Sequence, residues 1–342
     1  MRNARNTRRR SVKIGLTASL LVLLAALVVA GCGGGSSSGG GEQIAVVGYS
    51  TPQSVYEEGL EPAFEKTSNG SVASFTNSFG ASGDQSRAVA AGQPADLVHF
   101  SVGSDMTRLV EEGQVASNWE DNKYKGIGQD SVVVLAVKKG NPDGIKSFDD
   151  LLTKDVSVVT PNPFSSGSAR WNIMAIYGSQ IEQGKSEAQA LEAVKTVLEK
   201  TQAQPGSGRD AMTAFTQGQG DVLLTYENEA IKAEEAGEDV EYVIPEDTIK
   251  IETPIAVTKE ASPQAKQFLE FIWSEAGQKI WAENGYRPVD PKLVDPKKFP
   301  TPKGLFTIAK FGGWEKVKEQ FFEEKTGSIT KIEEELGVST AS

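Results

Sequence analysis

Four short segments of the chain combine the residue types that bind anions. Each places small polar residues between an expected strand and an expected helix: "GYSTPQSVY", "NSFGASGDQSRAV", "TPNPFSSGSARWN" and "PGSGRDAMTAF". Small side chains let backbone N–H groups approach a ligand, and the unpaired amides of a helix start carry the positive end of the helix dipole. One such segment has an ordinary explanation, because Ser, Gly and Asp are the usual caps of these loops. Four of them favour an anion site, since open α/β sheets bind ligands at the carboxyl ends of their strands.

Strands that alternate with helices must position these segments. The strand candidates are short runs rich in β-branched residues: "IAVVGYS", "VASFTNS", "ADLVHF", "SVVVLAV", "VSVVT", "DVLLTY", "EYVIP" and "TPIAVT". Helix starts carry their own signals, such as Ser147 with Asp150 as a capping box and Ser262 before Pro263. This alternation predicts α/β layers with mostly parallel sheets.

The middle of the chain has no Pro- or Ser-rich linker, although 342 residues exceed the usual length of a single domain. Two lobes would therefore be joined by strands, and "SVVVLAVKKGNP" and "IKIETPIAVTKE" are the expected crossings. The predicted division is a first part of lobe 1 over 43–127, lobe 2 over 128–253, and a second part of lobe 1 with C-terminal helices over 254–342.

The first residues indicate export and anchoring. Six basic residues and no acid precede an apolar run from Ile14 to Ala30, and "LVVAGC" then ends at Cys32 before "GGGSSSGGG". This order resembles the lipobox of bacterial lipoproteins. The resemblance implies a signal peptide over 1–31, a lipidated Cys32, a tether over 32–42, and an extracytoplasmic protein anchored to the cell membrane. A simple membrane anchor, or a signal cut elsewhere, is the alternative interpretation.

Composition excludes most enzyme classes and several partners. The formal net charge is −11, and without residues 1–31 it is about −17, which argues against nucleic-acid or acidic-lipid partners. Cys32 is the only cysteine, so disulfides and thiolate metal clusters are not expected. His99 is the only histidine, which argues against a His-built zinc site or a chymotrypsin-like triad network. We expect no metal and no cofactor.

Several longer motifs together resemble the periplasmic sulfate-binding proteins that serve ABC importers: "VVTPNPFSSGSARWN", "GDVLLTYENEA", "FGASGDQ", "AVKKGNP", "GYRP" and "LFTIAKFGGW". The likeness runs from about Ile44 to about residue 315 in one order. It implies a type II periplasmic-binding-protein fold, with two α/β lobes joined by two crossing strands and sulfate in the cleft between them. It also implies a monomer without catalytic residues that delivers sulfate to a membrane permease.

In this family sulfate is held by backbone amides, serine hydroxyls and a tryptophan indole N–H, without a direct counter-charge. The resemblance carries these roles to the amide of Ser50, the hydroxyl of Ser82, Ser166 with the amides of Gly167 and Ser168, the amide of Gly208, and Tyr226. Tyr226 replaces the family's tryptophan before "ENEA", and Ser168 stands where glycine is common. A phenol can accept as well as donate a hydrogen bond, so the ranking of sulfate against thiosulfate or molybdate stays open.

Phosphate is the main alternative ligand. A site that selects phosphate needs a buried acceptor for the proton of the anion. Asp84 is the candidate acceptor; alternatively it is a first-turn carboxylate that favours the helix dipole and pairs with Arg87. Arg170 and Arg209, just inside two helix starts, either neutralise the site from behind or pair with surface acids.

A surface serine hydrolase is the alternative from another class. Ser82 lies in "GASG", but the G-x-S-x-G elbow is not matched and His99 follows too closely to be the usual partner. We expect His99 to be a packed, hydrogen-bonded side chain instead.

Overall fold

The computed structural model describes residues 43–340, so the expected signal peptide, Cys32 and tether lie outside the described residues. Its strands are β1 (Gln43–Tyr49), β2 (Ser74–Gly80), β3 (Leu97–His99), β4 (Ile127–Lys138), β5 (Val158–Val159), β6 (Thr201–Ala203), β7 (Val222–Tyr226), β8 (Val240–Val243), β9 (Asp247–Val257) and β10 (Gly304–Phe306). Its α-helices are α1 (Gln53–Val55), α2 (Glu61–Glu65), α3 (Ser82–Ala90), α4 (Gly103–Glu111), α5 (Phe148–Thr153), α6 (Gly167–Glu182), α7 (Glu187–Glu199), α8 (Gly208–Thr216), α9 (Glu227–Glu235), α10 (Pro263–Trp273), α11 (Glu275–Glu283), α12 (Gly313–Val317) and α13 (Ser328–Glu335).

Two groups of parallel strands are joined by two long crossing strands. The strand order is β2-β1-β3-β9-β4-β7-β5-β6, with β10 on β9 and β8 on β4. Pairs β1–β2, β1–β3, β5–β6 and β5–β7 are parallel, whereas β9 runs antiparallel to both β3 and β4. The strands β4 and β9 overlap most of the two predicted crossing segments. The expected α/β type II architecture is therefore confirmed, and the exact lobe boundaries remain a proposal.

The parallel register brings the loops after the strands to one edge. Tyr49 at the end of β1 lies opposite Gly80 at the end of β2, and Gly48 lies opposite His99 at the end of β3. The polar segments that follow these three strands are therefore neighbours, because parallel strands end at the same edge.

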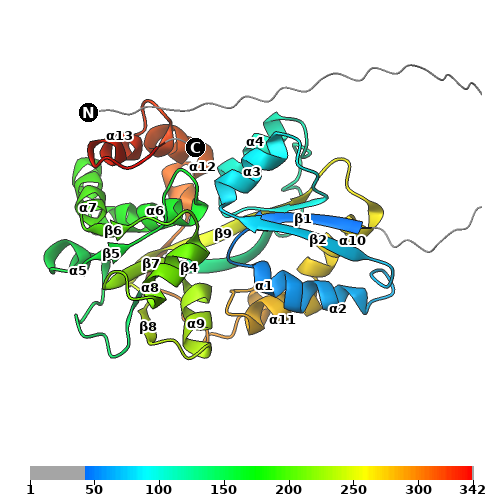
Figure 1. Cartoon of the computed structure of the whole chain (residues 1–342), viewed down its shortest axis with the longest axis horizontal. Coiled ribbons are helices and arrows are strands. Elements are labelled where there is room, and N and C mark those ends of the chain that lie inside the picture. The colour runs from blue at the N-terminus through cyan, green and yellow to red at the C-terminus, as the bar shows by residue number, and fades with distance from the viewer. Residues whose placement is uncertain (1–42, 341–342) are drawn as a thin grey trace, which may run out of the picture. The chain divides into compact units, whose positions relative to one another are not determined.

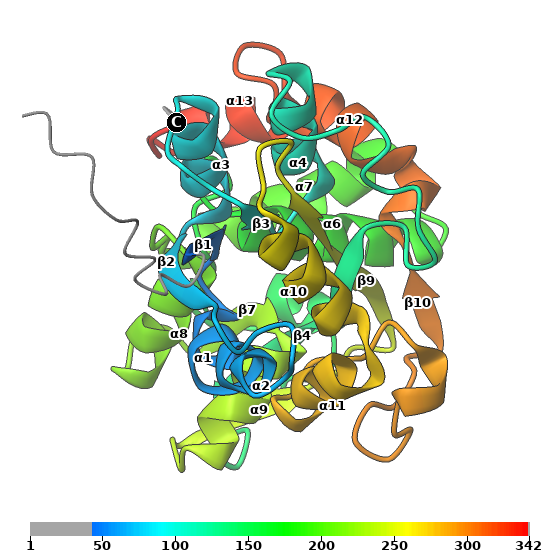
Figure 2. The ribbon, with the colours of Figure 1, turned by 90° about the vertical axis from the view of Figure 1, so that its right-hand side faces the viewer.

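Helices cover both faces of the first strand group. Figure 1 and Figure 2 show α3 and α4 on one side of β1 and β2, with α1 and α2 on the other. Side chains alternate along a strand, so Val46 packs with Phe268 and Trp281 while Val47 packs with Met106 in a different core cluster. The second strand group is likewise sandwiched: Val133 packs against α6 and α7, and Val134 against α8 and α9.

The C-terminal stretch packs with the second strand group. Its large apolar side chains join the same core cluster as α6 and α7: Phe306, Ile308, Trp314, Val317, Phe321, Phe322 and Ile329. Gln204 also donates to Glu333 in α13 at 3.0 Å. The sequence placed residues 254–342 with lobe 1. We therefore propose that the part from about Gly304 onward belongs to lobe 2, since its buried contacts lie there.

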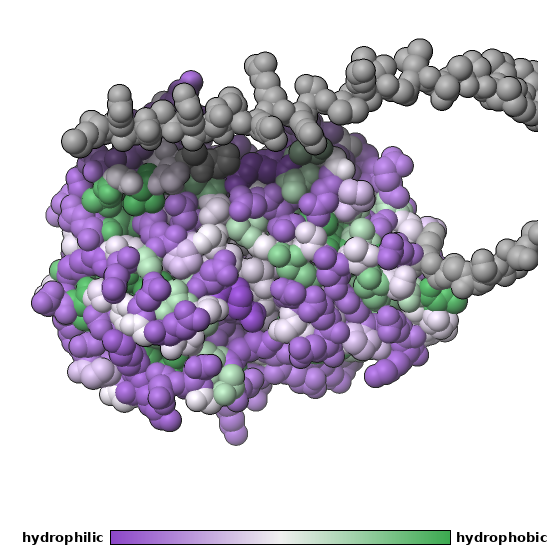
Figure 3. Space-filling view, in the orientation of Figure 1, coloured by the Kyte–Doolittle hydropathy of each residue, from purple (hydrophilic) through white to green (hydrophobic). Residues whose placement is uncertain are grey.

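The outer surface is polar. The face in Figure 3 is mainly hydrophilic, and among residues 43–340 Val72 is the large apolar side chain that stands out, at 55% exposed. None of the helices in the described part of the chain combines the length and apolar character needed to cross a membrane.

Candidate functional site

All four segments singled out in the sequence do lie between a strand and a helix. They connect β1 to α1, β2 to α3, β5 to α6 and β6 to α8. The residues before three of the helices, Ala81, Ser166 and Ser207, have extended backbone, so each chain enters its helix from a strand-like path. Helices α3 and α6 thus present first-turn amides beside buried small residues, which is the arrangement that favours an anion.

Most of the predicted site residues are buried. Ser82, Ser166, Ser168 and Tyr226 have at most 4% of their surface exposed. Ser50 is half-buried at the end of β1, and its neighbour Thr51 is buried.

Ser101 lies where the β2–α3 and β5–α6 segments meet the end of β7. Its Oγ is 2.5 Å from the Tyr226 hydroxyl, and its backbone N–H donates to Ser82 Oγ at 2.9 Å. A Cβ on Gly167 would lie 2.6 Å from Ser101 Oγ, so only glycine allows the start of α6 to approach this side chain. The sequence interpretation missed Ser101. The segment "HFSVGSD" was a detectable signal, because it also places small polar residues between a strand, β3, and a helix, α4.

Gly208 brings the fourth segment to the same place. A Cβ on Gly208 would lie 3.2 Å from Ser168 Oγ and 3.3 Å from Thr51 Cγ2. Thr51 in turn receives a hydrogen bond from the Tyr286 hydroxyl at 3.3 Å. The structure therefore gathers Ser82, Gly167, Ser168, Gly208 and Tyr226, with Ser101 and Thr51 as the connecting residues. Ser166 is the buried residue that precedes α6.

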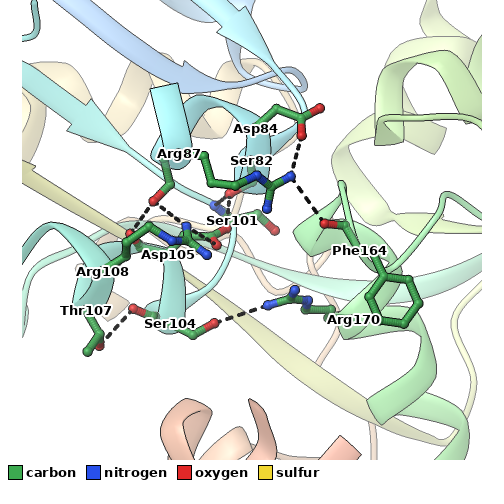
Figure 4. Close-up of polar contacts among 12 residues, drawn as sticks. Ser82, Asp84, Arg87, Ser101, Ser104, Asp105, Thr107, Arg108, Phe164 and Arg170 are labelled. Atoms are coloured by element: carbon green, nitrogen blue, oxygen red, sulfur yellow. Dashed lines mark hydrogen bonds and ion pairs between the residues drawn. The ribbon is translucent and has the colours of Figure 1, made fainter. Parts of the chain in front are cut away.

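Ser82 differs from its expected role as a free donor. Its hydroxyl donates to Asp105 Oδ2 at 2.7 Å, as Figure 4 shows, while it accepts the Ser101 amide. Asp105 is buried in the first turn of α4, and its other oxygen lies 3.3 Å from Arg108 Nη1. In this structure the hydrogen of Ser82 is thus committed to a carboxylate, and its oxygen accepts the Ser101 amide.

Both arginines near the site bind backbone carbonyls. Arg170 is buried; its Nε donates to the Pro163 carbonyl at 2.8 Å, and burial lowers its pKa. Arg209 donates to the Thr51 carbonyl at 2.7 Å and to buried Glu229 at 3.0 Å, and this carboxylate raises the pKa of Arg209. Arg170 and Arg209 are therefore not isolated ion pairs on the surface. They bind the loops around the site, Arg170 through a carbonyl oxygen and Arg209 through a carbonyl oxygen and Glu229.

Asp84 is a first-turn carboxylate and not a buried acceptor. Its side chain is 58% exposed and pairs with Arg87 at 2.5 Å, which confirms the simpler interpretation. Arg87 also contacts the Phe164 carbonyl at 3.4 Å (Figure 4). The Gly83 amide donates to the Ser165 carbonyl at 3.0 Å. The start of α3 therefore meets the loop before α6 directly.

His99 is a packed side chain, as expected. Its Nδ1 lies 2.8 Å from the Tyr56 hydroxyl and its Nε2 lies 3.1 Å from Thr253 Oγ1. Desolvation lowers its pKa to about 3, so the ring is neutral at physiological pH. Since both nitrogens are engaged away from Ser82, the residues do not form a serine–histidine pair.

The motif "ENEA" holds the surroundings of the site together. Glu227 binds Arg287 through two hydrogen bonds, Asn228 accepts from Ser131 at 3.1 Å, and Glu229 binds Arg209.

Within residues 43–340, no group of three or more His, Cys, Asp or Glu side chains is placed to hold a metal ion.

Known proteins resemble this chain over most of its length. A family model described as a bacterial extracellular solute-binding protein matches residues 44–287. A sulfate-binding protein of Synechococcus elongatus is 37% identical, and the match covers 82% of this chain and 83% of that protein. A thiosulfate-binding protein of Pseudomonas aeruginosa is 34% identical, with 81% and 88% covered. The solved structure of the sulfate-binding protein SubI from Mycobacterium tuberculosis is 43% identical with a TM-score of 0.79, over 82% of this chain and 99% of that one.

Proposed function

Because the chain belongs to the family of bacterial extracellular solute-binding proteins, we propose that it captures sulfate and delivers it to an ABC importer. Sulfate binds in the cleft between the two lobes, and thiosulfate is the nearest competitor, since relatives named for each anion cover most of the chain. The observation that carries the proposal is the convergence of the starts of α6 and α8 on the buried hydroxyls of Ser101, Ser168 and Tyr226.

The binding chemistry follows from this convergence. Fixed amides and hydroxyls replace the hydration that the anion gives up, and hydrogen bonds to an anion are shorter and stronger than neutral ones. The proposed ligands are the amides of Ser50, Gly167, Ser168 and Gly208 with the side chains of Ser166 and Tyr226. Ser82, whose hydrogen is donated to Asp105, positions the Ser101 amide beside them. Arg170 and Arg209 support the loops that carry these donors. Their positive charge favours an anion nearby without touching it.

Contacts between the lobes support capture by closure. The Trp171 indole donates to the Ser101 carbonyl at 2.8 Å, and Arg209 donates to the Thr51 carbonyl at 2.7 Å. Each bond joins one strand group to the other, so it forms only when the cleft walls meet. An anion that binds donors of both walls would shift the population toward this form.

The proposal includes a membrane anchor. A lipid on Cys32 and the Gly/Ser tether would hold a monomeric binding protein near its permease and raise its local concentration there. We place no catalytic step on the protein, because His99 and Ser82 bond to separate partners.

Calorimetric titration of the full-length chain in detergent, freed of bound anions, tests the function. We expect tight sulfate binding that varies little from about pH 5 to 8, since sulfate does not change protonation there. Thiosulfate, molybdate and phosphate are titrated in parallel. Absence of binding for all four anions would refute the function and leave the fold.

A further inference from the structure

Ser101 and Tyr226 form a hydroxyl pair with no charged partner. Their oxygens are 2.5 Å apart, and either atom can be the donor. Ser101 is 1% exposed and Tyr226 is fully buried. Burial raises the pKa of Tyr226, with hydrogen bonds from Ser101 and Ser168 acting in the opposite direction, so the phenol stays neutral. The pair joins the loop after β3 to the end of β7, and hence one cleft wall to the other.

This pair lies at the start of α6, within the candidate site. Gly167 has no room for a Cβ beside Ser101 Oγ, and Ser168 lies next to Gly208. Any anion held by the first-turn amides of α6 would therefore lie close to both hydroxyls.

A hydroxyl pair can present either a donor or an acceptor. If Ser101 donates to Tyr226, the phenol hydrogen is free for the ligand; if Tyr226 donates, the serine hydrogen is free. In each case the other oxygen keeps a lone pair that can accept. An indole N–H at the position of Tyr226 could only donate.

We infer that Ser101 and Tyr226 act as one ligand-contacting unit that accepts a hydrogen bond from the protonated oxygen of a singly protonated tetrahedral oxyanion of the hydrogen phosphate class. The inference rests on the proposed function, because it uses the same cleft and adds hydrogen phosphate to sulfate as a ligand of that cleft. A carboxylate acceptor would repel sulfate, whereas a neutral hydroxyl pair needs only to rotate. Asp84 cannot fill the role, since it is exposed and paired with Arg87, and both oxygens of Asp105 are engaged.

The experiment compares three doubly charged tetrahedral anions on the full-length chain at pH 8: sulfate, hydrogen phosphate and monofluorophosphate. Only hydrogen phosphate carries a proton. We expect the wild-type protein to bind hydrogen phosphate more tightly than monofluorophosphate. Tyr226→Trp and Ser101→Ala should each raise the ratio of sulfate to hydrogen phosphate affinity by about tenfold or more, the usual effect of leaving a polar group of a bound ligand unpaired. The double variant should show no further change in the ratio, because the two residues act together.

The controls separate binding from folding. Ser179→Ala removes a buried serine hydroxyl that bonds to the Ile176 carbonyl, and it should leave all three affinities unchanged. Tyr226→Phe gives a second test if the tryptophan variant does not fold. Tight sulfate binding with hydrogen phosphate excluded, or a ratio unchanged in both variants, would overturn the inference and leave the proposed function intact. Failure of the wild-type chain to bind sulfate would overturn the proposed function. If hydrogen phosphate still bound and its binding depended on Ser101 and Tyr226, the inference about these two residues would be supported. Binding of neither anion would overturn both the function and the inference.

Discussion

Arg287 and Glu227 form a bidentate ion pair in the interior of the protein. The Arg287 Nε lies 2.6 Å and Nη2 2.8 Å from the two carboxylate oxygens, and the side chains are 8% and 0% exposed. The pair joins "GYRP" to "ENEA", two motifs that lie 60 residues apart along the chain. It fixes the first turn of α9, directly after Tyr226.

Arg287→Ala should destabilise the protein strongly. The substitution leaves the Glu227 carboxylate buried without its partner, which costs about 3 to 5 kcal/mol in comparable cases. Urea unfolding measures this loss. Lys279→Ala is the matched control, because Lys279 pairs with Glu275 on the surface, where a pair contributes less than about 1 kcal/mol. Equal losses for the two variants would contradict the structural role of the buried pair.

Three glycine substitutions should lower sulfate affinity in the order of how little space surrounds each glycine. Gly167→Ala places a Cβ 2.6 Å from Ser101 Oγ, Gly208→Ala has its nearest neighbour at 3.2 Å, and Gly206→Ala has none within 4 Å. We expect sulfate affinity to fall by at least about tenfold, or 1.4 kcal/mol, for Gly167→Ala. The fall should be smaller for Gly208→Ala and negligible for Gly206→Ala. Calorimetry checks this order. Unchanged sulfate affinity in Gly167→Ala would show that the start of α6 is not part of the binding site.

Ser82→Ala should weaken both binding and stability. It removes the hydroxyl that bonds to Asp105 Oδ2 and to the Ser101 amide, so a carboxylate oxygen and an amide lose their partners. The expected loss of stability is about 1 to 3 kcal/mol, and sulfate affinity should fall because Ser101 is displaced. Thermal unfolding with and without sulfate separates the two effects. Unchanged values in both measurements would show that this network is not part of the site.

Glu61 should make stability fall as pH rises. Desolvation raises its pKa from the ordinary value of 4.5 to about 7, against the hydrogen bond from Asn77. Between these values the folded state binds a proton that the unfolded state has lost, so the free energy of unfolding decreases from about pH 4.5 to pH 7. Glu61→Gln should remove this dependence and stabilise the protein at pH 8 by about 1 to 2 kcal/mol. Exposed Glu65 provides the control variant Glu65→Gln, and identical pH profiles for wild type and Glu61→Gln would refute the assignment.

Cys32→Ala should abolish lipid attachment. If Cys32 is the lipidated residue, the variant should stay an unprocessed precursor or appear in the medium, whereas Ser38→Ala in the tether should behave as wild type. Metabolic labelling with a fatty acid and membrane fractionation measure both properties. Normal processing and full membrane retention of the cysteine variant would exclude the lipoprotein proposal.

Local signals in the sequence were sufficient for most of the elements and of the site segments, although the short strands β6 and β10 were not among the predicted strands. Ser147 with Asp150 forms the predicted capping box, and Ser262 caps α10 before Pro263, because a cap and its amides lie within four residues. The β2–α3 and β5–α6 segments were likewise readable from adjacent residues. The role of Ser101 was not, although its segment had the same pattern, because its partners lie 19 and 125 residues away.

The sequence by itself determined the alternation of strands and helices, the two crossing strands and the loops that carry backbone donors. Each depends on residue order over a few turns or on the spacing of apolar residues. Only the tertiary structure decided which hydroxyl faces which partner: Ser82 donates to Asp105, Tyr226 meets Ser101, and the C-terminal helices pack with α6 and α7. Hydrogen-bond direction and packing partners depend on distances between segments far apart in the chain, which folding sets and residue order does not specify.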